Sequence, residues 1–256
     1  MSDLLKILVV VFFTYITVQC SQLPVTVPAN TIDAENPDNS TDNADNSADE
    51  SPTTTVIPTT EDQWTIVYNG YGSVNFDSEN GIVMEPQPPT GSNTHAALVL
   101  AKTTQENPIK DFRTTIVYST DAQLRAASPN SWEVFWLFFN FNFRDPNNIS
   151  SGELTNYFIF KTNGIELGRA FDDDAATEQQ VFLYTASTPQ IVISQTYTLT
   201  LEKRSQNLDV YINNILIFSY TGSASPDVLY DVPGMIALYT EDARVTVYSV
   251  NIENWD

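Results

Sequence analysis

Residues Trp132–Phe143 have the sequence Trp-Glu-Val-Phe-Trp-Leu-Phe-Phe-Asn-Phe-Asn-Phe. Nearly every position is apolar or aromatic, so an extended chain here is apolar on both faces. Aromatic residues favour strands, and a strand that is apolar on both faces suits the middle of a sheet. We therefore predict a central strand. Asn140 and Asn142 lie an even number of residues from Trp136 and Phe138, so in an extended strand these four side chains point to the same side. This predicts that the amides and the indole lie together on one concave sheet surface.

Shorter strand-like runs occur on both sides of this segment, and Gly, Pro and Asn separate them. Tyr197–Glu202 alternates apolar and polar residues, as a sheet with one wet face requires. Leu208–Ile212, Asn213-Asn214 and Ile215–Tyr220 form a hairpin pattern, because Asn tolerates the positive φ of a tight turn. Further runs are Thr65–Tyr68, Ala96–Leu100, Thr114–Tyr118, Tyr157–Lys161, Met235–Tyr239 and Arg244–Ile252. The sequence thus predicts an all-β fold, with two antiparallel sheets packed face to face as a β-sandwich of the jelly-roll kind.

Composition divides the 256 residues into three parts. Residues 1–20 begin with little charge and continue in the apolar run Ile7–Ile16 toward Cys20, a pattern typical of a secretory signal peptide. That run is roughly half as long as a membrane-spanning helix requires, so no membrane attachment is expected after cleavage. Residues 21–62 contain nine carboxylates, no Lys or Arg and no aromatic residue, which predicts a disordered acidic spacer. Residues 63–256 form the predicted sandwich domain.

Several classes of function are excluded by what the chain lacks. Cys20 is the only cysteine, so cleavage after it leaves no thiol for a disulfide, a nucleophile or a zinc site. His95 is the only histidine, and a catalytic triad would have to use it. The formal net charge of −21 argues against nucleic acid or anionic membranes as partners. The signal peptide predicts the secretory pathway, either the Golgi lumen or the outside of the cell.

The most concentrated chemical feature is the loop Asp172-Asp173-Asp174-Ala175-Ala176-Thr177-Glu178. Like charges this close repel, and a bound divalent cation relieves the repulsion in a folded loop. Asp172 and Asp174 have the same parity, and Asp111 is a single carboxylate that can complete a site from a neighbouring loop. Oxygen ligands favour Ca, Mn or Mg. The alternative is an acidic surface loop that binds no ion.

Three further sets of residues are candidates for binding or modification. Glu241 and Asp242, with Glu61 or Asp62, are candidates for a structural metal, and a local ion pair to Arg244 is the alternative. Asn39 and Asn148 begin Asn-x-Ser/Thr glycosylation sequons. Glu133 and Glu166 fall in predicted strands and are the candidate carboxylate pair of a glycosidase, which requires two such groups across a cleft.

Four segments together resemble the concanavalin-like sandwich domains of the keto-disaccharide-hydrolase and laminin-G type. These are Trp132–Phe139, Asn156–Arg169, Asp209–Phe218 and Pro233–Ala243. The resemblance implies this fold for about residues 63–253, but the fold serves lectins, hydrolases and adhesion modules alike.

The order of signal peptide, acidic spacer and cysteine-free sandwich also resembles the tardigrade anhydrobiosis-related manganese-dependent peroxidases. That resemblance implies an antioxidant enzyme of the secretory pathway, acting in oxidative stress during desiccation. Its partners would be hydrogen peroxide and a small reducing substrate, with Mn held by Asp172 and Asp174 and with Asp111 as a further ligand. Two other hypotheses stay open: a carbohydrate-binding or glycoside-hydrolase-like sandwich with a glycan partner, and an adhesion module stabilised by Ca.

Overall fold

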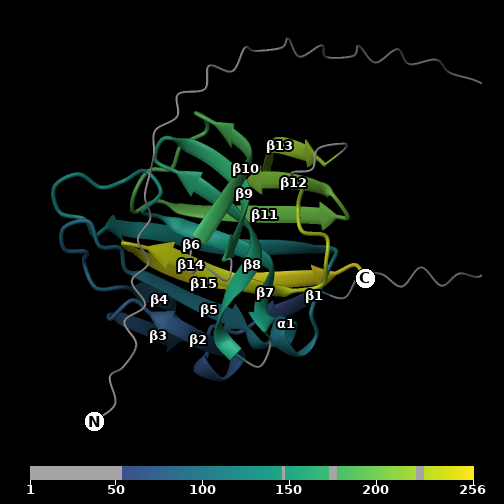
Figure 1. Ribbon diagram of the computed structural model, residues 1–256, viewed down its shortest axis with the longest axis horizontal. Coiled ribbons are helices and arrows are strands. Elements are labelled where there is room, and N and C mark those ends of the chain that lie inside the picture. Colours follow the sequence, from purple (N-terminus) through teal and green to yellow (C-terminus); the bar gives the residue numbers. More distant parts are fainter. Residues whose placement is uncertain (1–53, 146–147, 173–177, 223–227) are drawn as a thin grey trace, which may run out of the picture. The chain divides into compact units, whose positions relative to one another are not determined.

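The computed structural model describes residues 54–145, 148–172, 178–222 and 228–256, although not the side chains of 148–151, 172 and 178. Within these residues the chain forms two antiparallel sheets, as predicted, and Figure 1 shows β8, β9 and β10 running across the direction of β11 and β12. None of the described helices is long and apolar enough to cross a membrane. They are the five-residue α1 (Lys102–Glu106) and the short 3-10 turn η1 (Glu61–Gln63).

The first sheet has eight strands, and β6 and β15 form its centre. Its order is β13 (Ile215–Thr221), β12 (Asn207–Ile212), β11 (Thr196–Arg204), β6 (Phe112–Gln123), β15 (Ala243–Asn254), β4 (Gly81–Glu85) and β3 (Ser73–Asp77), with β1 (Thr54–Ile57) also paired to β15. The predicted hairpin is confirmed as β12 and β13, and Asn213 and Asn214 both take positive φ in its turn.

The second sheet has seven strands. Its order is β10 (Glu178–Ala186), β9 (Gly164–Asp172), β8 (Asn148–Lys161), β7 (Phe135–Asp145), β14 (Met235–Glu241), β5 (Ala96–Ala101) and β2 (Trp64–Asn69). The segment that predicted a central strand is therefore confirmed, because β7 has three strands on either side.

Alternate side chains of β7 point to opposite faces of this sheet. Phe135 lies 4.4 Å from Tyr118 and Phe139 lies 6.0 Å from Phe112, measured between ring centroids, and both partners belong to β6 of the other sheet. These β7 residues therefore face the core between the sheets. Trp136 and Phe138 have the other parity and lie on the outer face.

The prediction that Asn140 and Asn142 share the surface of Trp136 is wrong. A β-bulge shifts the register of β7 here, and Asn140 takes a φ of 49°. Its Nδ2 donates to the carbonyl oxygens of Ile109 (3.2 Å) and Val232 (2.9 Å), so the amide ties neighbouring loops together. Asn142 likewise donates to backbone carbonyls. A bulge reverses the parity on which the prediction relied.

The sandwich begins earlier in the chain than its predicted start at Gln63. Thr54–Ile57 pairs with β15 in the register Thr54↔Glu253 to Ile57↔Val250, and Ile57 is buried. This short β-favouring run follows an acidic segment, and composition alone assigned it to the predicted spacer of residues 21–62. The signal peptide and the rest of that spacer lie outside the described residues.

Candidate functional site

The outer face of the seven-stranded sheet presents a row of side chains in register across six neighbouring strands. Residues that are directly opposite on paired strands share a face, which places them in one line. From β2 to β9 this row consists of Tyr68, Leu98, Tyr239, Trp136, Ile159 and Glu166.

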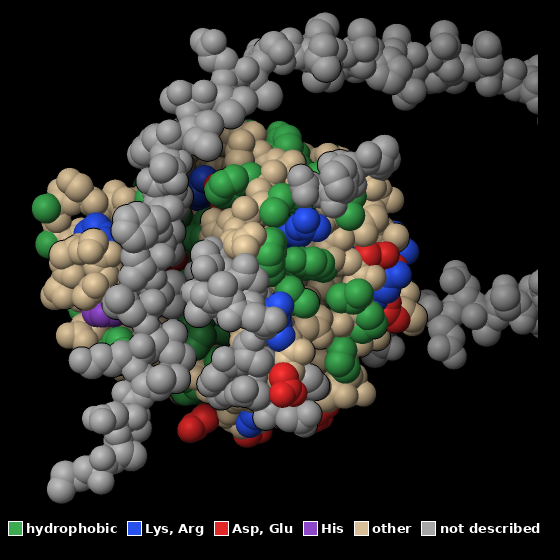
Figure 2. Space-filling view, viewed as in Figure 1, with side chains coloured by type: hydrophobic (Ala, Val, Ile, Leu, Met, Phe, Trp, Pro, Cys, Tyr) green, Lys and Arg blue, Asp and Glu red, His purple; other side chains and the backbone are tan. Residues whose placement is uncertain are grey.

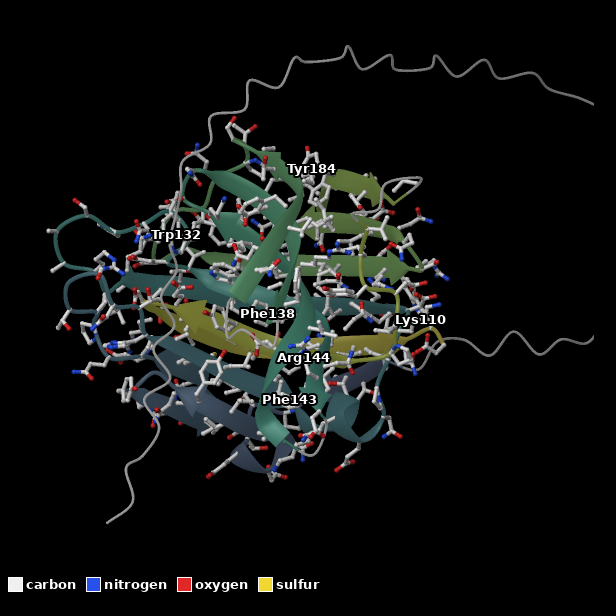
Figure 3. All side chains as sticks on the ribbon, in the orientation of Figure 1. Lys110, Trp132, Phe138, Phe143, Arg144 and Tyr184 are labelled. Atoms are coloured by element: carbon white, nitrogen blue, oxygen red, sulfur yellow. The ribbon has the colours of Figure 1, made fainter. Side chains whose placement is uncertain are left out.

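Aromatic rings dominate the middle of this face, where Figure 3 labels Phe138. The Trp136 ring centroid lies 5.3 Å from that of Tyr157 and 5.4 Å from that of Tyr239. Phe138 stacks on Tyr239 at 4.7 Å with an interplanar angle of 15°. We call Trp136, Phe138, Tyr157 and Tyr239 the aromatic face. Three of these rings are buried, since Tyr157 is 0%, Phe138 4% and Trp136 5% exposed, whereas Tyr239 is half-buried and Tyr68 at the border is 36% exposed.

Polar groups border the aromatic face. The Tyr157 hydroxyl donates to Glu166 Oε1 at 3.0 Å, and Lys161 Nζ donates to Oε2 of the same carboxylate at 2.5 Å. Trp136 Nε1 donates to the carbonyl oxygen of Trp132 at 2.8 Å. The face therefore combines large apolar surfaces with fixed donors and acceptors at its edges.

A buried ionic cluster supports the loops at one end of this sheet. Arg125 donates to Glu133 Oε1 at 2.6 Å and to Asp242 Oδ2 at 2.5 Å, and both carboxylate side chains are fully buried. Burial raises the pKa of Asp242, although a hydrogen bond from the backbone N–H of His95 and the charge of Arg125 act to lower it. We call Arg125, Glu133 and Asp242 the arginine cluster.

The structural metal predicted at Glu241 and Asp242 stays a prediction. Both oxygens of Asp242 already accept hydrogen bonds, Oδ1 from the His95 backbone at 2.8 Å and Oδ2 from Arg125. Glu241 Oε2 accepts from the Tyr239 hydroxyl at 3.2 Å. The site is thus already occupied by hydrogen-bond donors of the chain.

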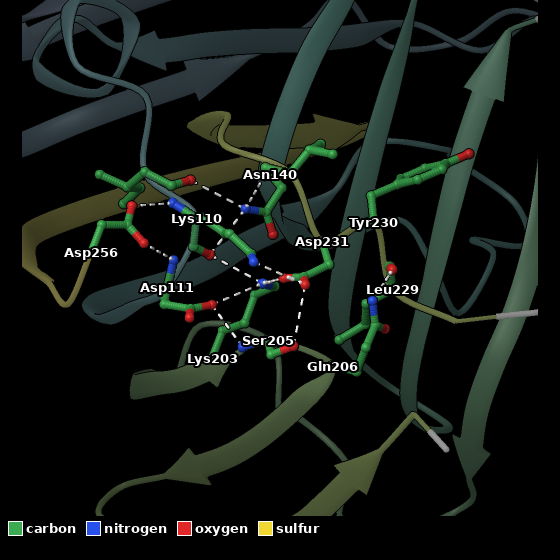
Figure 4. A network of polar contacts seen from close by, with 12 residues as sticks. Lys110, Asp111, Asn140, Lys203, Ser205, Gln206, Leu229, Tyr230, Asp231 and Asp256 are labelled. Atoms are coloured by element: carbon green, nitrogen blue, oxygen red, sulfur yellow. Dashed lines mark hydrogen bonds and ion pairs between the residues drawn. The ribbon is translucent and has the colours of Figure 1, made fainter. Parts of the chain in front are cut away.

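Asp111 belongs to a second polar network, drawn in Figure 4. Its Oδ1 accepts from the Ser205 backbone N–H at 2.7 Å and from Lys203 Nζ at 3.4 Å. Lys203 is fully buried and also donates to Asp231 at 3.0 Å. Burial acts to raise the pKa of Asp231, but hydrogen bonds from Lys203 and Lys110 outweigh it and lower that pKa. The network ties Asp111 to a buried ammonium, and its predicted metal role stays a prediction.

The acidic loop lies largely outside the described residues. Asp172 ends β9 opposite Glu178, its side chain is not described, and Asp173 and Asp174 fall within the gap. Elsewhere in the described chain, no three His, Cys, Asp or Glu side chains gather as a metal site. The predicted manganese or calcium site in this loop stays a prediction. Of the glycosylation sequons, Asn39 lies outside the described residues, and Asn148 begins β8 with its side chain undescribed.

The candidate glycosidase pair is not assembled as predicted. Glu133 lies before β7 rather than in a strand, because the sequence Trp-Glu-Val continues a loop into that strand. Its carboxylate accepts from Arg125 and from Asn130, whereas Glu166 accepts from Tyr157 and Lys161. The two carboxylates share no partner.

The sequence analysis did not identify Arg125, Lys203, Tyr157 or Tyr239. One signal was available for Lys203, because it continues the apolar parity of Leu199 and Leu201 in β11 and is buried like them. A lysine at such a position indicates a buried ion pair. No local pattern marks Arg125, because the loop that carries Glu133 and the distant Asp242 meet it only in the folded chain.

Comparison with known proteins shows the fold. No protein-family model and no curated protein matches this chain. A Bacillus subtilis protein of unknown function with a galectin-like fold superposes with a TM-score of 0.54, 13% identity, and coverage of 78% of this chain and 94% of that chain.

Two sugar-related structures superpose less well. For a carbohydrate-binding module from Bacillus subtilis the TM-score is 0.49 at 14% identity, with 75% of this chain and 96% of that chain covered. A β-glucanase from Bacillus licheniformis superposes with a TM-score of 0.48 at 10% identity, with 78% of this chain and 98% of that chain covered. Scores below 0.5 carry no argument, so the comparisons show a galectin-like β-sandwich.

Proposed function

We propose that the sandwich is a binding module for neutral glycans and that sugar rings dock on the outer side of the seven-stranded sheet. The observation that carries this proposal is the row of side chains on this side of the sheet, in which Tyr68 and Tyr239 keep ring surface open to solvent beside the buried rings of the aromatic face. Sugar rings offer C–H surfaces that pack against aromatic rings, and their hydroxyl groups need hydrogen-bond partners at the border. A carboxylate oxygen can accept more than one hydrogen bond, so Glu166 can serve a sugar hydroxyl beside its bonds from Tyr157 and Lys161.

The charge of the chain supports neutral ligands. A net charge of −21 repels sulfated and uronic-acid glycans, particularly at low salt. Neutral hexoses carry no such penalty, and stacking and hydrogen bonding are short-ranged enough to act within an acidic field.

Binding without hydrolysis fits the carboxylates better than catalysis does. Glycoside hydrolysis uses two carboxyl groups roughly 5 to 10 Å apart across the sugar, one of them free to give its proton. On the aromatic face, Tyr157 and Lys161 occupy both oxygens of Glu166. Glu133 is fully buried in the arginine cluster. We therefore expect no release of reducing ends from any bound glycan.

The test is calorimetric titration with neutral hexasaccharides of glucose and of N-acetylglucosamine. It uses the chain from Ser21 onward, the mature form that the predicted cleavage leaves. Tyr68→Ala removes an exposed ring from the row and should weaken binding about fivefold. Leu216→Ala removes a side chain of similar exposure, 50%, from β13 of the other sheet and should leave binding unchanged. Flat titrations with every hexasaccharide would contradict the proposal.

The manganese-dependent peroxidase implied by the sequence resemblance is a separate proposal with its own test. It rests on the four carboxylates of residues 172–178, whose mutual repulsion favours a divalent cation. Peroxide consumption by the metal-stripped chain should return with Mn and be lost in Asp172→Asn. The absence of peroxide consumption with Mn, Ca or Mg would contradict this proposal.

A further inference from the structure

The turn between β2 and β3 holds a tyrosine in an unfavourable backbone conformation. Gly70 and Tyr71 take φ values of 60° and 62° in succession, and the N–H of Gly72 donates to the carbonyl of Asn69 at 3.1 Å. Glycine takes a left-handed φ freely, but a bulky side chain does so only under strain. Strained residues of this kind cluster at binding sites.

The turn itself accounts for the positive φ, because two successive left-handed residues closed by this hydrogen bond are the I′ kind of tight turn, but it does not account for a tyrosine at this position. Tyr71 is 74% exposed, the highest value among the large hydrophobic side chains of the described residues. Figure 2 shows other hydrophobic side chains reaching the surface in scattered patches. An exposed aromatic ring on a strained backbone contributes little to the core, so a ligand contact accounts for it better than stability does.

The partner of this ring is the single histidine of the chain. The rings of Tyr71 and His95 meet edge to face, with centroids 5.4 Å apart and an interplanar angle of 72°. His95 Nδ1 lies 2.7 Å from the carbonyl oxygen of Gln87. A carbonyl oxygen only accepts, so Nδ1 carries the proton, and in the neutral ring Nε2 keeps a lone pair. The pair thus offers a flat apolar surface beside a hydrogen-bond acceptor.

Hydrogen bonds hold the backbone beneath both rings in place. The His95 backbone N–H donates to Asp242 of the arginine cluster at 2.8 Å. The turn is held as well, because the Gln87 N–H donates to the Gly70 carbonyl at 2.9 Å. A Cβ added to Gly70 would lie 2.7 Å from the carbonyl oxygen of Ala96, so the turn abuts the start of β5. A site built in this way loses little freedom when a ligand binds.

The pair also lies next to the row that contains the aromatic face. Tyr71 follows Tyr68 of that row by three residues, and His95 directly precedes β5, where Ala96 pairs with Glu241. We propose that Tyr71 and His95 form an end subsite that receives one pyranose ring of a neutral glycan. Tyr71 packs against its C–H face and His95 Nε2 accepts from a hydroxyl group. This inference rests on the proposed glycan binding.

NMR titration of the chain from Ser21 onward tests the subsite and the proposed function separately. The probes are neutral hexasaccharides of glucose and of N-acetylglucosamine, and the signals are the ring resonances of Tyr71, His95 and Trp136. Shifts at Tyr71 and His95 support the subsite, whatever Trp136 does. Shifts at Trp136 alone overturn the subsite and leave the aromatic face standing. No shift at any ring with either sugar overturns both.

Two variants distinguish ligand contact from a structural role. Tyr71→Gly suits the observed φ, so it should weaken hexasaccharide binding about fivefold without lowering the melting temperature. His95→Asn places an amide near Nδ1 to serve the Gln87 carbonyl but removes Nε2, and it should weaken binding while keeping the fold. A lower melting temperature with unchanged affinity in both variants would show that the pair is structural.

Discussion

Replacing Arg125 by methionine tests how far the arginine cluster supports the end of the sheet beside Tyr71 and His95. The change removes the guanidinium that lies 2.6 Å from Glu133 and 2.5 Å from Asp242 and keeps a side chain of comparable length. Both carboxylate side chains are 0% exposed, whereas that of Arg125 is 19% exposed. The variant therefore keeps two buried carboxylates close together without their cation.

Removing one partner of a buried ion pair lowers the free energy of unfolding by about 3–5 kcal/mol. Because Arg125→Met leaves two buried carboxylates without their cation, we expect a loss at the upper end of this range. Arg125 also donates to the carbonyl of Gly91 at 2.9 Å, which loses its donor. For a domain of this size, each kcal/mol lowers the melting temperature by roughly 2–4 °C, so a drop of about 8–20 °C is expected. Thermal and urea denaturation followed by circular dichroism at pH 7 measure it.

The stability deficit should shrink in acid. Burial already raises the pKa of Asp242 above 3.8 in the native state, and removing Arg125 takes away a group that lowers it. For an acid whose folded pKa is raised, the folded state binds more protons, so its destabilising effect fades as pH falls through that pKa.

Arg244→Met is the matched control. Its guanidinium is 47% exposed and lies 3.7 Å from Glu85, so its loss should cost under about 1 kcal/mol. An Arg125→Met variant that behaves like this control, or whose deficit grows in acid, would refute the account of the cluster.

Three other predictions follow from single contacts. Lys203→Met should cost about 3 kcal/mol in urea at pH 7, because Asp231 loses its buried ammonium. Since the folded pKa of Asp231 is lowered, the wild type should lose this advantage as pH falls below about 4, and an equal deficit at pH 7 and pH 3 would contradict that. Gly168→Ala should lower the free energy of unfolding by about 1–3 kcal/mol, because a Cβ there would lie 2.4 Å from the Tyr157 hydroxyl and 2.7 Å from the Val181 carbonyl. An unchanged melting temperature would mean that both groups move aside. Affinity for a neutral hexasaccharide should change less than about twofold between low and high salt in calorimetry, and a steep salt dependence would indicate a charged ligand instead.

The strands that were identified from the sequence each depend on a local pattern, whereas β3, β4 and β10 were not identified. A few neighbouring residues are enough to predict the structure in three cases: the apolar segment of β7, the alternation of β11 and the Asn213-Asn214 turn. β1 was not predictable in the same way, because Thr54–Ile57 is held by pairing with β15 at the other end of the chain. Pairing between distant segments leaves no local trace.

The aromatic face was only partly predictable, because a face is decided by register and by bulges. The side of the sheet that carries Trp136 and Phe138 was predictable from alternation along the strand, but Asn140 was misplaced since a bulge interrupts β7 beyond Phe139. Tyr157 and Tyr239 join Trp136 only through the pairing of β7 with β8 and β14. The tautomer of His95 likewise depends on one distant carbonyl.

The central claim is that this side of the seven-stranded sheet binds neutral glycans, and the most direct test is calorimetric titration of the mature chain and its Tyr239→Leu variant with the hexasaccharide that binds best. Leucine keeps apolar bulk beside Trp136 and Phe138 but removes the half-buried Tyr239 ring and its hydroxyl. The account predicts micromolar to millimolar binding by the wild type, about fivefold to tenfold weaker binding by the variant, and no new reducing ends in either sample. Equal affinity of the two chains, or no heat of binding with any neutral hexasaccharide, would contradict it.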